Sequence, residues 1–526
     1  MACVYFLLAG LSFLPNLGVE SDETIFAMAF LKPTGGAYAM RIGHAHIPLM
    51  IMSYIGTLKA GLYLPILRMF GTGMLPLRLP MLLAGVGSLW LFFLLLRRIA
   101  GERAAVIGCT LLAADATYLL TICFDWGPVA LQHLLLLGGT LLVVRFCQRQ
   151  SHRALFWGFF LLGLAIWDKA LAVWMLSGMG VASAVVFPRL ILRLLTRRRV
   201  ALAVAGFLLG ALPLLIFNEK NHWATFRGNF HKDTSDLPGK ARMLMNTAKG
   251  GGLFGWMFDE DWQTAAPHPA RGWAQEFSAE ISSLTGHPRH HLLFYAFLLA
   301  LALGPLARGD ALRAMAFALI ALAVAWVQMA ITANAGGSVH HTILLWPLPQ
   351  LVVAVSFAAA SRRLGRAGLP ALAVVGAAMV IAGVLVGAEY QYVSFRYGGS
   401  PVWTDAIFGL RDYMKGVHTG NVYCVDWGIL DGLRLLSNGT LPLLVGDDPI
   451  SKPELSPQDR APVERMVADP GAVFIAHTKD FENFREVNHK LVQFAEGIGY
   501  RREMMAVIPD TYGRPAYEVY RFVAMP

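Results

Sequence analysis

Charged residues are scarce in this sequence of 526 residues: Asp, Glu, Lys and Arg together make up 15%, and 56% of the residues are hydrophobic. Soluble domains carry about a quarter charged residues, so the composition excludes an ordinary soluble protein and indicates a polytopic membrane protein. Only five cysteines are present, and their positions form neither a disulfide framework nor a zinc-binding spacing. The N-terminus also lacks a basic segment and a small-residue cleavage site, so we expect no removable signal peptide; its first apolar run is short, which is compatible with a start upstream of Met1.

The basic residues exceed the acidic ones, with a formal net charge of +10. An excess of this kind can indicate nucleic-acid binding. Here, however, the arginines cluster in short links between apolar runs, which is the topology signal of a membrane protein. We therefore expect membrane lipids around the chain and no nucleic-acid partner.

Apolar runs long enough to cross a bilayer, which takes about 20 residues, recur along the first three quarters of the chain. We predict about eleven transmembrane helices, at about 1–17, 77–96, 104–122, 128–147, 154–167, 170–188, 200–217, 291–307, 314–333, 342–360 and 369–388. Five links between them are arginine-rich, and the positive-inside rule places these in the cytoplasm. The sequence thus predicts a multi-pass protein of the plasma (inner) membrane. Residues 1–388 form its transmembrane domain, with loops 18–76 and 218–290 on the outer, periplasmic or extracytoplasmic face.

Two segments need a separate interpretation. Residues 154–188 are almost continuously apolar, but Asp168 and Lys169 interrupt them, so we predict a hairpin of two short helices with a local ion pair at its tip. Residues 46–71 are long enough to span, yet they carry Lys59 near their centre. An unpaired lysine in mid-membrane costs roughly 3 kcal/mol, so we expect surface-lying or broken helices on the outer face.

The pattern changes at about residue 389, and we predict a soluble α/β domain over 389–526 on the outer face. Its expected strands are 421–427, 441–446 and 471–477, and a closing hairpin follows near the C-terminus. Ser456 followed by Pro457 is a typical helix start. This domain contains no glycine-rich phosphate loop and no nucleophile motif, so it offers no catalytic signal of its own.

Ionisable and aromatic residues gather in the links assigned to the outer face. They are Asp22, Glu23, Arg41, His44, His46, Lys59, Asp125, Trp126, Asp168, Lys169, His287, Arg289, His290, His291, His340 and His341. A scaffold would not need so many polar groups on one membrane face, whereas a site for a charged, lipid-embedded substrate would. Glycosyl transfer from a lipid-phosphate sugar fits, because it needs cations or a metal for the departing phosphate and a carboxylate to take the acceptor's proton.

Several motifs resemble the GT-C superfamily of polyprenyl-phosphate-sugar-dependent glycosyltransferases, especially the protein O-mannosyltransferase and lipid A aminoarabinose transferase type. "ESDETIFA" resembles the Asp-Glu motif of the first outer loop, and "GTLKAGLYLP" resembles the family's lysine stretch, although Ala60 and Gly61 stand where the family has two prolines. "FDWGPVALQ" looks like the second acidic motif, and "GGSVHHTILLWPLP" like the histidine-bearing entry to a late helix. The resemblance is patchy and covers roughly residues 1–360.

The resemblance implies a GT-C-like, α-helical polytopic fold and an enzyme that moves a hexosyl or pentosyl group from a polyprenyl-phosphate donor to a lipid, glycan or protein acceptor, with inversion. Asp22 would be the general base, Glu23 a supporting or metal-facing acid, and Asp125 a group that positions a sugar. Donor-phosphate contacts would come from Lys59, Arg41, His340 and His341, and substrate contacts from Trp126, Lys169 and Arg289. A divalent metal is an open possibility that the sequence does not require, since no tight ligand spacing is present.

Other interpretations remain open at this stage. Asp22 and Glu23 could be solvated loop acids, Lys59 a snorkelling interfacial lysine, and Asp125 a helix N-cap beside a membrane-belt tryptophan. The whole chain could instead be a transporter or flippase of a lipid-linked or polar substrate, but transporters place ionisable groups near the bilayer midplane and often show internal repeats. It could also be a membrane-anchored binding or assembly protein that acts through its α/β domain.

Overall fold

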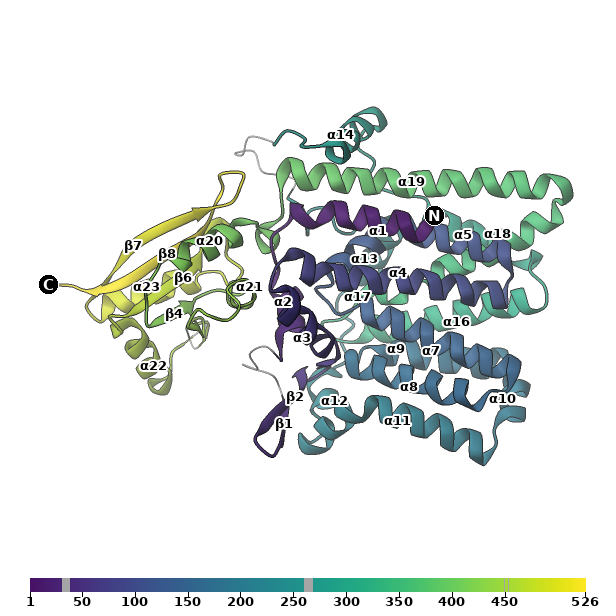
Figure 1. Cartoon of the computed structure of the whole chain (residues 1–526), viewed down its shortest axis with the longest axis horizontal. Helices are drawn as coiled ribbons and strands as arrows, with labels where there is room; N and C mark the ends of the chain where they lie inside the picture. Colours follow the sequence, from purple (N-terminus) through teal and green to yellow (C-terminus); the bar gives the residue numbers. More distant parts are fainter. Residues whose placement is uncertain (31–37, 260–267, 449, 453) are drawn as a thin grey trace.

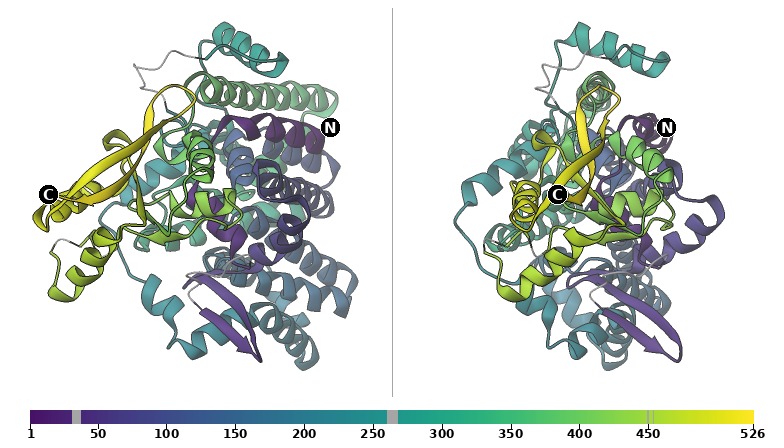
Figure 2. Two further views of the ribbon diagram at one scale, coloured as in Figure 1. Left: turned by 60° about the vertical axis from the view of Figure 1, so that its left-hand side comes forward. Right: turned by 90° about the vertical axis from the view of Figure 1, so that its left-hand side faces the viewer.

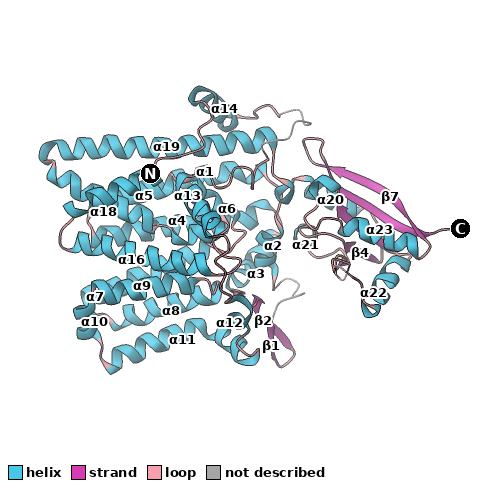
Figure 3. Cartoon of the chain, turned by 180° about the vertical axis from the view of Figure 1, so that it is seen from behind, coloured by secondary structure: helices cyan, strands magenta, loops and turns pink. Residues whose placement is uncertain are grey.

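The computed structural model describes residues 1–30, 38–259, 268–448, 450–452 and 454–526. A bundle of helices occupies most of it, and a smaller α/β region lies at one end of the bundle (Figure 1). Viewed from behind, the strands are confined to this region and to a hairpin at the same end (Figure 3). The predicted loops 18–76 and 218–290 include 31–37 and 260–267, which lie outside the described residues.

Six helical segments of the described chain are long and apolar enough to cross a membrane. They are α4 (Met74–Ile99), α7 (Ala130–Arg149), α11 (Arg197–Lys220), α16 (Asp310–Ile331), Val339–Arg363, which includes α17 (Val339–Thr342) and α18 (Leu348–Arg363), and Gly365–Tyr397, which includes α19 (Gly368–Tyr397). Up to nine spans result if each bent pair is one span: α1 (Ala2–Phe13) with α2 (Ser21–Met28), α5 (Glu102–Ala113) with α6 (Ala116–Phe124), and α9 (Ala172–Val186) with α10 (Pro188–Leu194). The polytopic fold is therefore confirmed, whereas the count of eleven is not.

Shorter helices complete the bundle. They are α8 (His152–Asp168), α12 (Ala224–Asn229), α13 (Leu237–Lys249), α14 (Trp273–Thr285) and α15 (Leu293–Leu303). The hairpin predicted around residue 168 is present, because α8 ends at Asp168 and α9 begins at Ala172. Glycines let α8 and α11 approach closely: a Cβ atom on Gly163 would overlap the Phe207 carbonyl oxygen. Small residues at such contacts are typical of helix pairs in membranes.

The segment 46–71 differs from the prediction in its first half. Residues 38–56 form a small antiparallel sheet of β1 (Tyr38–Ile42), β2 (Ala45–Met52) and β3 (Ile55–Gly56). Ile42 pairs with Ala45, and Gly43 between them has φ +60°, so a two-residue hairpin turn fixes this register. Only the second half is helical, as α3 (Leu58–Phe70). The expectation of broken helices throughout was wrong because the glycine turn favours a hairpin.

The C-terminal α/β region contains a five-stranded sheet in the order β5-β4-β6-β8-β7. Its strands are β4 (Asn421–Cys424), β5 (Leu443–Val445), β6 (Ala472–His477), β7 (Tyr500–Pro509) and β8 (Pro515–Ala524), and its helices are α20 (Ala406–Lys415), α21 (Leu430–Leu436), α22 (Pro457–Ala468) and α23 (Val487–Gly497). The predicted strands and the closing hairpin are confirmed. Ser456 caps α22 in a capping box with Asp459.

The boundary of this region lies later than predicted, because α19 continues to Tyr397 instead of ending near residue 388. Polar residues on its last turns find partners within the bundle: the Gln391 amide donates to the Ser12 carbonyl oxygen at 3.1 Å, and Asn16 donates to the Ser394 hydroxyl at 2.8 Å. These contacts allow the helix to extend through a polar stretch whose composition suggests a change of domain.

The α/β region and the bundle meet at α2. The peptide N–H of Gly18, just before α2, donates to the Trp403 carbonyl oxygen at 2.9 Å, and a Cβ atom on Gly18 would overlap the Thr404 carbonyl oxygen. Only glycine permits this close approach. Helix α21 packs on α2 (Figure 1), and two further views show the α/β region against this end of the bundle (Figure 2).

Candidate active site

The first acidic motif lies on α2, which turns by 110° from α1 and is thereby taken out of the spanning direction. Glu20 caps this helix by accepting a hydrogen bond from the Glu23 peptide N–H at 3.0 Å. Asp22 and Glu23 therefore stand in the first turn, where the helix dipole favours negative charge. Their two side chains have different surroundings.

Glu23 is held by a buried arginine that the sequence interpretation missed. Arg78 of α4 donates from Nε to Glu23 Oε1 at 2.7 Å and from Nη2 to Oε2 at 3.0 Å. The same guanidinium donates to the carbonyl oxygens of Leu14 and Gly18, at 2.9 Å and 2.5 Å. Arg78 thus ties α2 and the chain before it to α4. An arginine inside an apolar run was the available signal, since such a residue needs a partner.

Lys59 and Asp125 form a buried ion pair, with 2.7 Å between Lys59 Nζ and Asp125 Oδ2. Lys59 Nζ also donates to the Asp125 carbonyl oxygen at 3.1 Å. Asp125 Oδ1 accepts from the peptide N–H groups of Val129 and Ala130 at 2.7 Å and 2.9 Å, so this carboxylate caps the start of α7. Asp125 is not the N-cap residue of α7, which is Val129, although its carboxylate binds the first peptide N–H groups of that helix. Lys59 is not a snorkelling lysine, because its side chain is only 2% exposed.

Asp168 and Lys169 lie at the end of α8, next to this pair. Lys169 Nζ donates to the Gly127 carbonyl oxygen at 2.5 Å, and the Gln132 amide donates to the Lys169 carbonyl oxygen at 3.1 Å. Within the described residues, Asp168 and Lys169 do not form the predicted ion pair. Neither carboxylate oxygen of Asp168 has a hydrogen-bond partner there. Both side chains are buried, so this tip is part of the protein interior rather than a solvated turn.

Asp22 faces the two lysines from outside the spanning segments. Burial raises its pKa to about 6, the nearby Asp431 carboxylate adds to this rise, and the Lys169 and Lys59 ammonium groups oppose it. Its side chain is only partly buried, whereas Glu23, Asp125 and Asp168 are fully buried. Within the described residues, the Asp22 carboxylate forms no ion pair. It is partly accessible, and its pKa of about 6 lies close to neutral pH.

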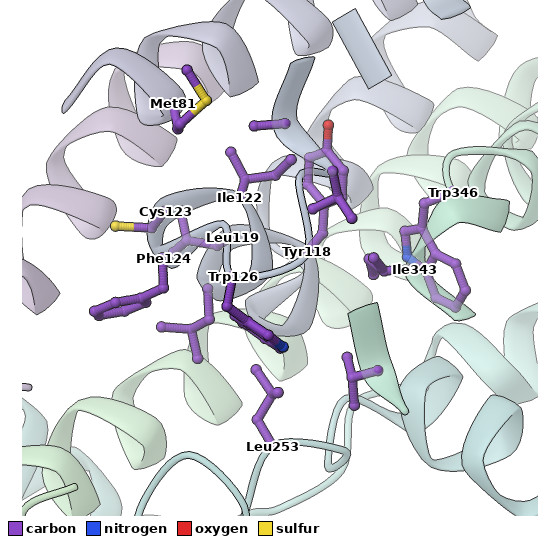
Figure 4. Packing of buried hydrophobic residues seen from close by; sticks show 14 of the residues in the cluster. Met81, Tyr118, Leu119, Ile122, Cys123, Phe124, Trp126, Leu253, Ile343 and Trp346 are labelled. Carbon is purple, nitrogen blue, oxygen red and sulfur yellow. The ribbon is translucent and has the colours of Figure 1, made fainter. Parts of the chain in front are cut away.

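An aromatic cluster adjoins Lys169 through Gly127. Trp126 donates from Nε1 to His340 Nδ1 at 3.1 Å, and its ring lies 4.8 Å from that of Trp256 and 5.7 Å from that of Trp403. A Cβ atom on Gly127 would lie 2.7 Å from the His340 ring, so glycine permits this contact. The His341 ring lies beside that of His340 in a tilted arrangement, with 4.2 Å between ring centroids. Figure 4 shows Trp126 in the buried cluster that also contains Phe124 and Leu253.

Two predicted residues lie elsewhere. Arg41 is exposed on the β1–β2 hairpin, where its Nε donates to the Gly43 carbonyl oxygen at 3.2 Å. Arg289 is also exposed, with its guanidinium 5.2 Å from the centroid of the Phe254 ring. The contacts described for these two arginines involve Gly43 and Phe254 and do not include Lys59, Lys169 or Asp22.

His291 and Asp115 form a second polar cluster inside the bundle. His291 is buried, with Nε2 at 3.6 Å from Asp115 Oδ1. Asp115, which the sequence interpretation missed, also accepts from Trp346 Nε1 at 2.6 Å and from the Gln350 amide at 3.1 Å. Across the described parts of the chain, no group of three or more His, Cys, Asp or Glu side chains is placed to hold a metal ion.

Comparisons with known proteins add to this geometry. The family described as dolichyl-phosphate-mannose-protein mannosyltransferase matches residues 64–217, a range that includes Asp125 and Lys169 but not Asp22 or Lys59. No curated protein matches the chain.

Solved structures share its fold. The structure of ArnT from Cupriavidus metallidurans bound to undecaprenyl phosphate superposes with a TM-score of 0.59 at 14% identity, over 98% of this chain and 96% of that chain. The apo form of the same protein gives 0.57 at 14% identity, over 98% and 97%. The oligosaccharyltransferase of Archaeoglobus fulgidus, in complex with Zn and sulfate, gives 0.50 at 12% identity, over 91% and 68%.

Proposed function

We propose that this chain is a GT-C membrane glycosyltransferase that moves a sugar from a polyprenyl-phosphate donor to an acceptor hydroxyl, a proposal supported by the family match over residues 64–217 and by the shared fold of ArnT. Undecaprenyl phosphate in the ArnT structure and the dolichyl phosphate in the family's description support a donor of this class. The sugar is a hexosyl or pentosyl group, and the acceptor is a lipid, a glycan or a protein. The arginine-rich links favour a site on the outer face, with the α/β region above it.

The single observation that carries this proposal is the arrangement of Asp22 opposite Lys59 and Lys169. Glu23 and Asp125 are occupied by Arg78 and Lys59, which makes them positioning residues instead of reacting groups. Asp22 alone in this group combines accessibility with a pKa of about 6, so it is deprotonated at neutral pH and able to accept a proton. We therefore assign the general base to Asp22.

The two lysines are suited to hold the donor phosphate. An ammonium group has three N–H donors. Within the described residues, Lys59 uses two of them on Asp125, and Lys169 uses one on the Gly127 carbonyl oxygen. Each lysine therefore keeps at least one N–H for a phosphate oxygen while its own position is fixed. Donors fixed in advance stabilise developing charge without reorganisation, which is why such sites are effective.

His340 and Trp126 complete the donor side. Because Trp126 donates to His340 Nδ1, the neutral imidazole carries its proton on Nε2, which leaves an N–H that can bind the phosphate or the sugar. We keep His341 as a further phosphate contact, since its ring adjoins that of His340. Arg41 lies on the exposed β1–β2 hairpin, and we do not assign it to the donor phosphate.

The transfer then follows from this geometry. The acceptor hydroxyl attacks the anomeric carbon from the face opposite the phosphate, and Asp22 takes its proton as the new C–O bond forms. The bond between the anomeric carbon and the phosphate oxygen breaks, and polyprenyl phosphate leaves with the electron pair between the lysines. One displacement of this kind inverts the anomeric configuration.

Asp22→Asn tests the assignment in purified protein in nanodiscs, with a panel of polyprenyl-phosphate sugars and a membrane acceptor fraction. Loss of a catalytic base typically costs 10²–10⁴-fold in rate, so we expect about this fall in polyprenyl phosphate release. Asp412→Asn, an exposed aspartate of the α/β region, is the matched control. The wild-type rate should rise with pH through about 6, where Asp22 loses its proton. Equal release by wild type and Asp22→Asn would refute the base assignment, and no release by either would refute the function.

A further inference from the structure

An acidic residue of the α/β region reaches the helix that carries the proposed base. Asp431, in the first turn of α21, accepts a hydrogen bond from the Ser21 hydroxyl, with 3.4 Å between Ser21 Oγ and Asp431 Oδ2. Ser21 immediately precedes Asp22 at the start of α2. Arg434, one turn later on α21, pairs with the other oxygen of Asp431 at 3.2 Å, and the Asp431 side chain remains 17% exposed. The carboxylate is therefore fixed in direction, with Oδ2 toward α2.

The backbone makes this contact rigid. Gly18 admits Thr404 at one end of the junction, and Gly432, next to Asp431, would place a Cβ atom 3.4 Å from the Val19 carbonyl oxygen. Both contacts involve the residues just before Ser21, so the α/β region touches the chain where it enters α2. These backbone contacts and the Ser21 hydrogen bond together hold Asp431 at the start of α2.

Charged and titratable groups approach Asp22 from every element packed against it. They are Glu20 and Glu23 on its own segment, Lys59 on α3, Tyr54 between β2 and β3, Lys169 after α8, and Asp431 with Arg434 on α21. Three of these groups stand in ion pairs: Glu23 with Arg78, Lys59 with Asp125, and Asp431 with Arg434. Burial and the Asp22 charge both raise the pKa of Glu20, which is therefore protonated more readily than a normal glutamate. Asp431, although it pairs with Arg434, is the neighbouring charge that raises the pKa of Asp22, and it acts against Lys169 and Lys59.

We propose that Asp431 is a positioning residue of the transfer reaction: the α/β region places this carboxylate opposite Asp22 and so makes Asp22 a stronger base. The inference rests on the proposed function. A carboxylate flanked by two lysines would otherwise be a weak base at neutral pH, because nearby cations stabilise its charged form. A like charge offsets this effect without blocking access to the oxygens. The catalytic base of the membrane domain would then depend on docking of the soluble region.

Asp431→Asn is the decisive variant, because the amide oxygen still accepts from Ser21 while the charge is lost. We expect the midpoint of the acid limb of kcat/KM to fall from about 6 by roughly half to one pH unit, and the plateau rate to fall severalfold with the weaker base. Asp431→Glu keeps the charge and should retain the wild-type midpoint. Asp412→Asn, on the same region but exposed, should change nothing. A purely structural role for Asp431 would lower the rate at all pH values and leave the midpoint in place.

A second measurement reports on Asp22 without turnover. A hydrophobic carbodiimide reacts with protonated carboxyl groups, so the extent of labelling at Asp22, read by mass spectrometry across pH, gives its midpoint directly. We expect this midpoint to move down in Asp431→Asn by the same amount as the acid limb. An unchanged midpoint in folded Asp431→Asn overturns the inference, and so does the same loss in Asp431→Glu. If the asparagine variant does not fold, Asp431→Ser supplies the neutral side chain. Wild-type donor cleavage that is lost in Asp22→Asn establishes the function separately.

Discussion

Lys59 and Asp125 can be removed separately or together, and the comparison separates their structural role from a role in catalysis. Both side chains are 2% exposed and lie 2.7 Å apart. Removing one partner of a buried pair leaves the other charge uncompensated, which costs on the order of 3–5 kcal/mol. Lys59→Met and Asp125→Asn should each destabilise the protein by about this amount. At about 2–4 °C per kcal/mol for mid-sized domains, Tm should fall on the order of 10 °C.

The double variant Lys59→Met, Asp125→Asn should recover most of this stability. The amide oxygen introduced by Asp125→Asn would still accept from the Val129 and Ala130 peptide N–H groups, which preserves the cap of α7. Replacing both members of a buried pair is often close to neutral, because no charge remains unpaired. Thermal unfolding of the detergent-solubilised protein, measured for the wild type and three variants, gives the coupling energy.

Activity should not recover in the double variant. If Lys59 binds the donor phosphate, its loss removes a fixed donor, which typically costs about 10²–10³ in rate. Loss of Lys59 also removes one of the two cations that lower the pKa of Asp22, so the acid limb should move to higher pH. A stable double variant with wild-type donor cleavage would refute the assignment of Lys59 to the phosphate and leave it as a structural residue.

Two further outcomes follow from the junction around α2. Arg78→Leu should destabilise the bundle by about 3–5 kcal/mol because Glu23 would be buried without its partner. Adding Glu23→Gln to this variant should restore part of the lost stability in a thermal unfolding assay. No recovery would contradict the pairing of Glu23 with Arg78. Gly18→Ala should separate the α/β region from α2, since its Cβ would overlap the Thr404 carbonyl oxygen. We expect faster proteolysis near residue 404 and slower transfer. An unchanged digestion pattern would argue against a close junction at Gly18.

Features set by local sequence were predictable. Apolar runs show a multi-pass membrane protein because no soluble domain can hide so much hydrophobic surface. In the α/β region, the strand segments and the start of α22 at Ser456 were identified correctly, since alternation and capping act over a few residues. The pair Asp22 and Glu23 was also singled out by sequence, although without any means of separating their roles.

Errors arose where the local signal was interpreted with the wrong period or the wrong partner. Residues 46–56 were expected in surface-lying or broken helices, but they lie in β2 and β3, and β2 pairs with β1 across the turn at Gly43. Asp168 and Lys169 are adjacent and opposite in charge, so an ion pair was expected, but Lys169 turns to the Gly127 carbonyl oxygen instead. The helix α19 continues through residues 389–397 because its polar side chains find partners in the bundle.

Tertiary structure alone decided which acidic side chains are paired and which one is free to react. Glu23 meets Arg78 across 55 positions, Lys59 meets Asp125 across 66, and Ser21 meets Asp431 across 410. Inside a bilayer the apolar pattern does not tell one helix from another, because lipid tails are as apolar as leucine and neighbours are chosen by packing and polar contacts. The amino-acid sequence therefore shows which groups are costly to bury, and the fold determines which partner satisfies each one and which carboxylate stays free to react.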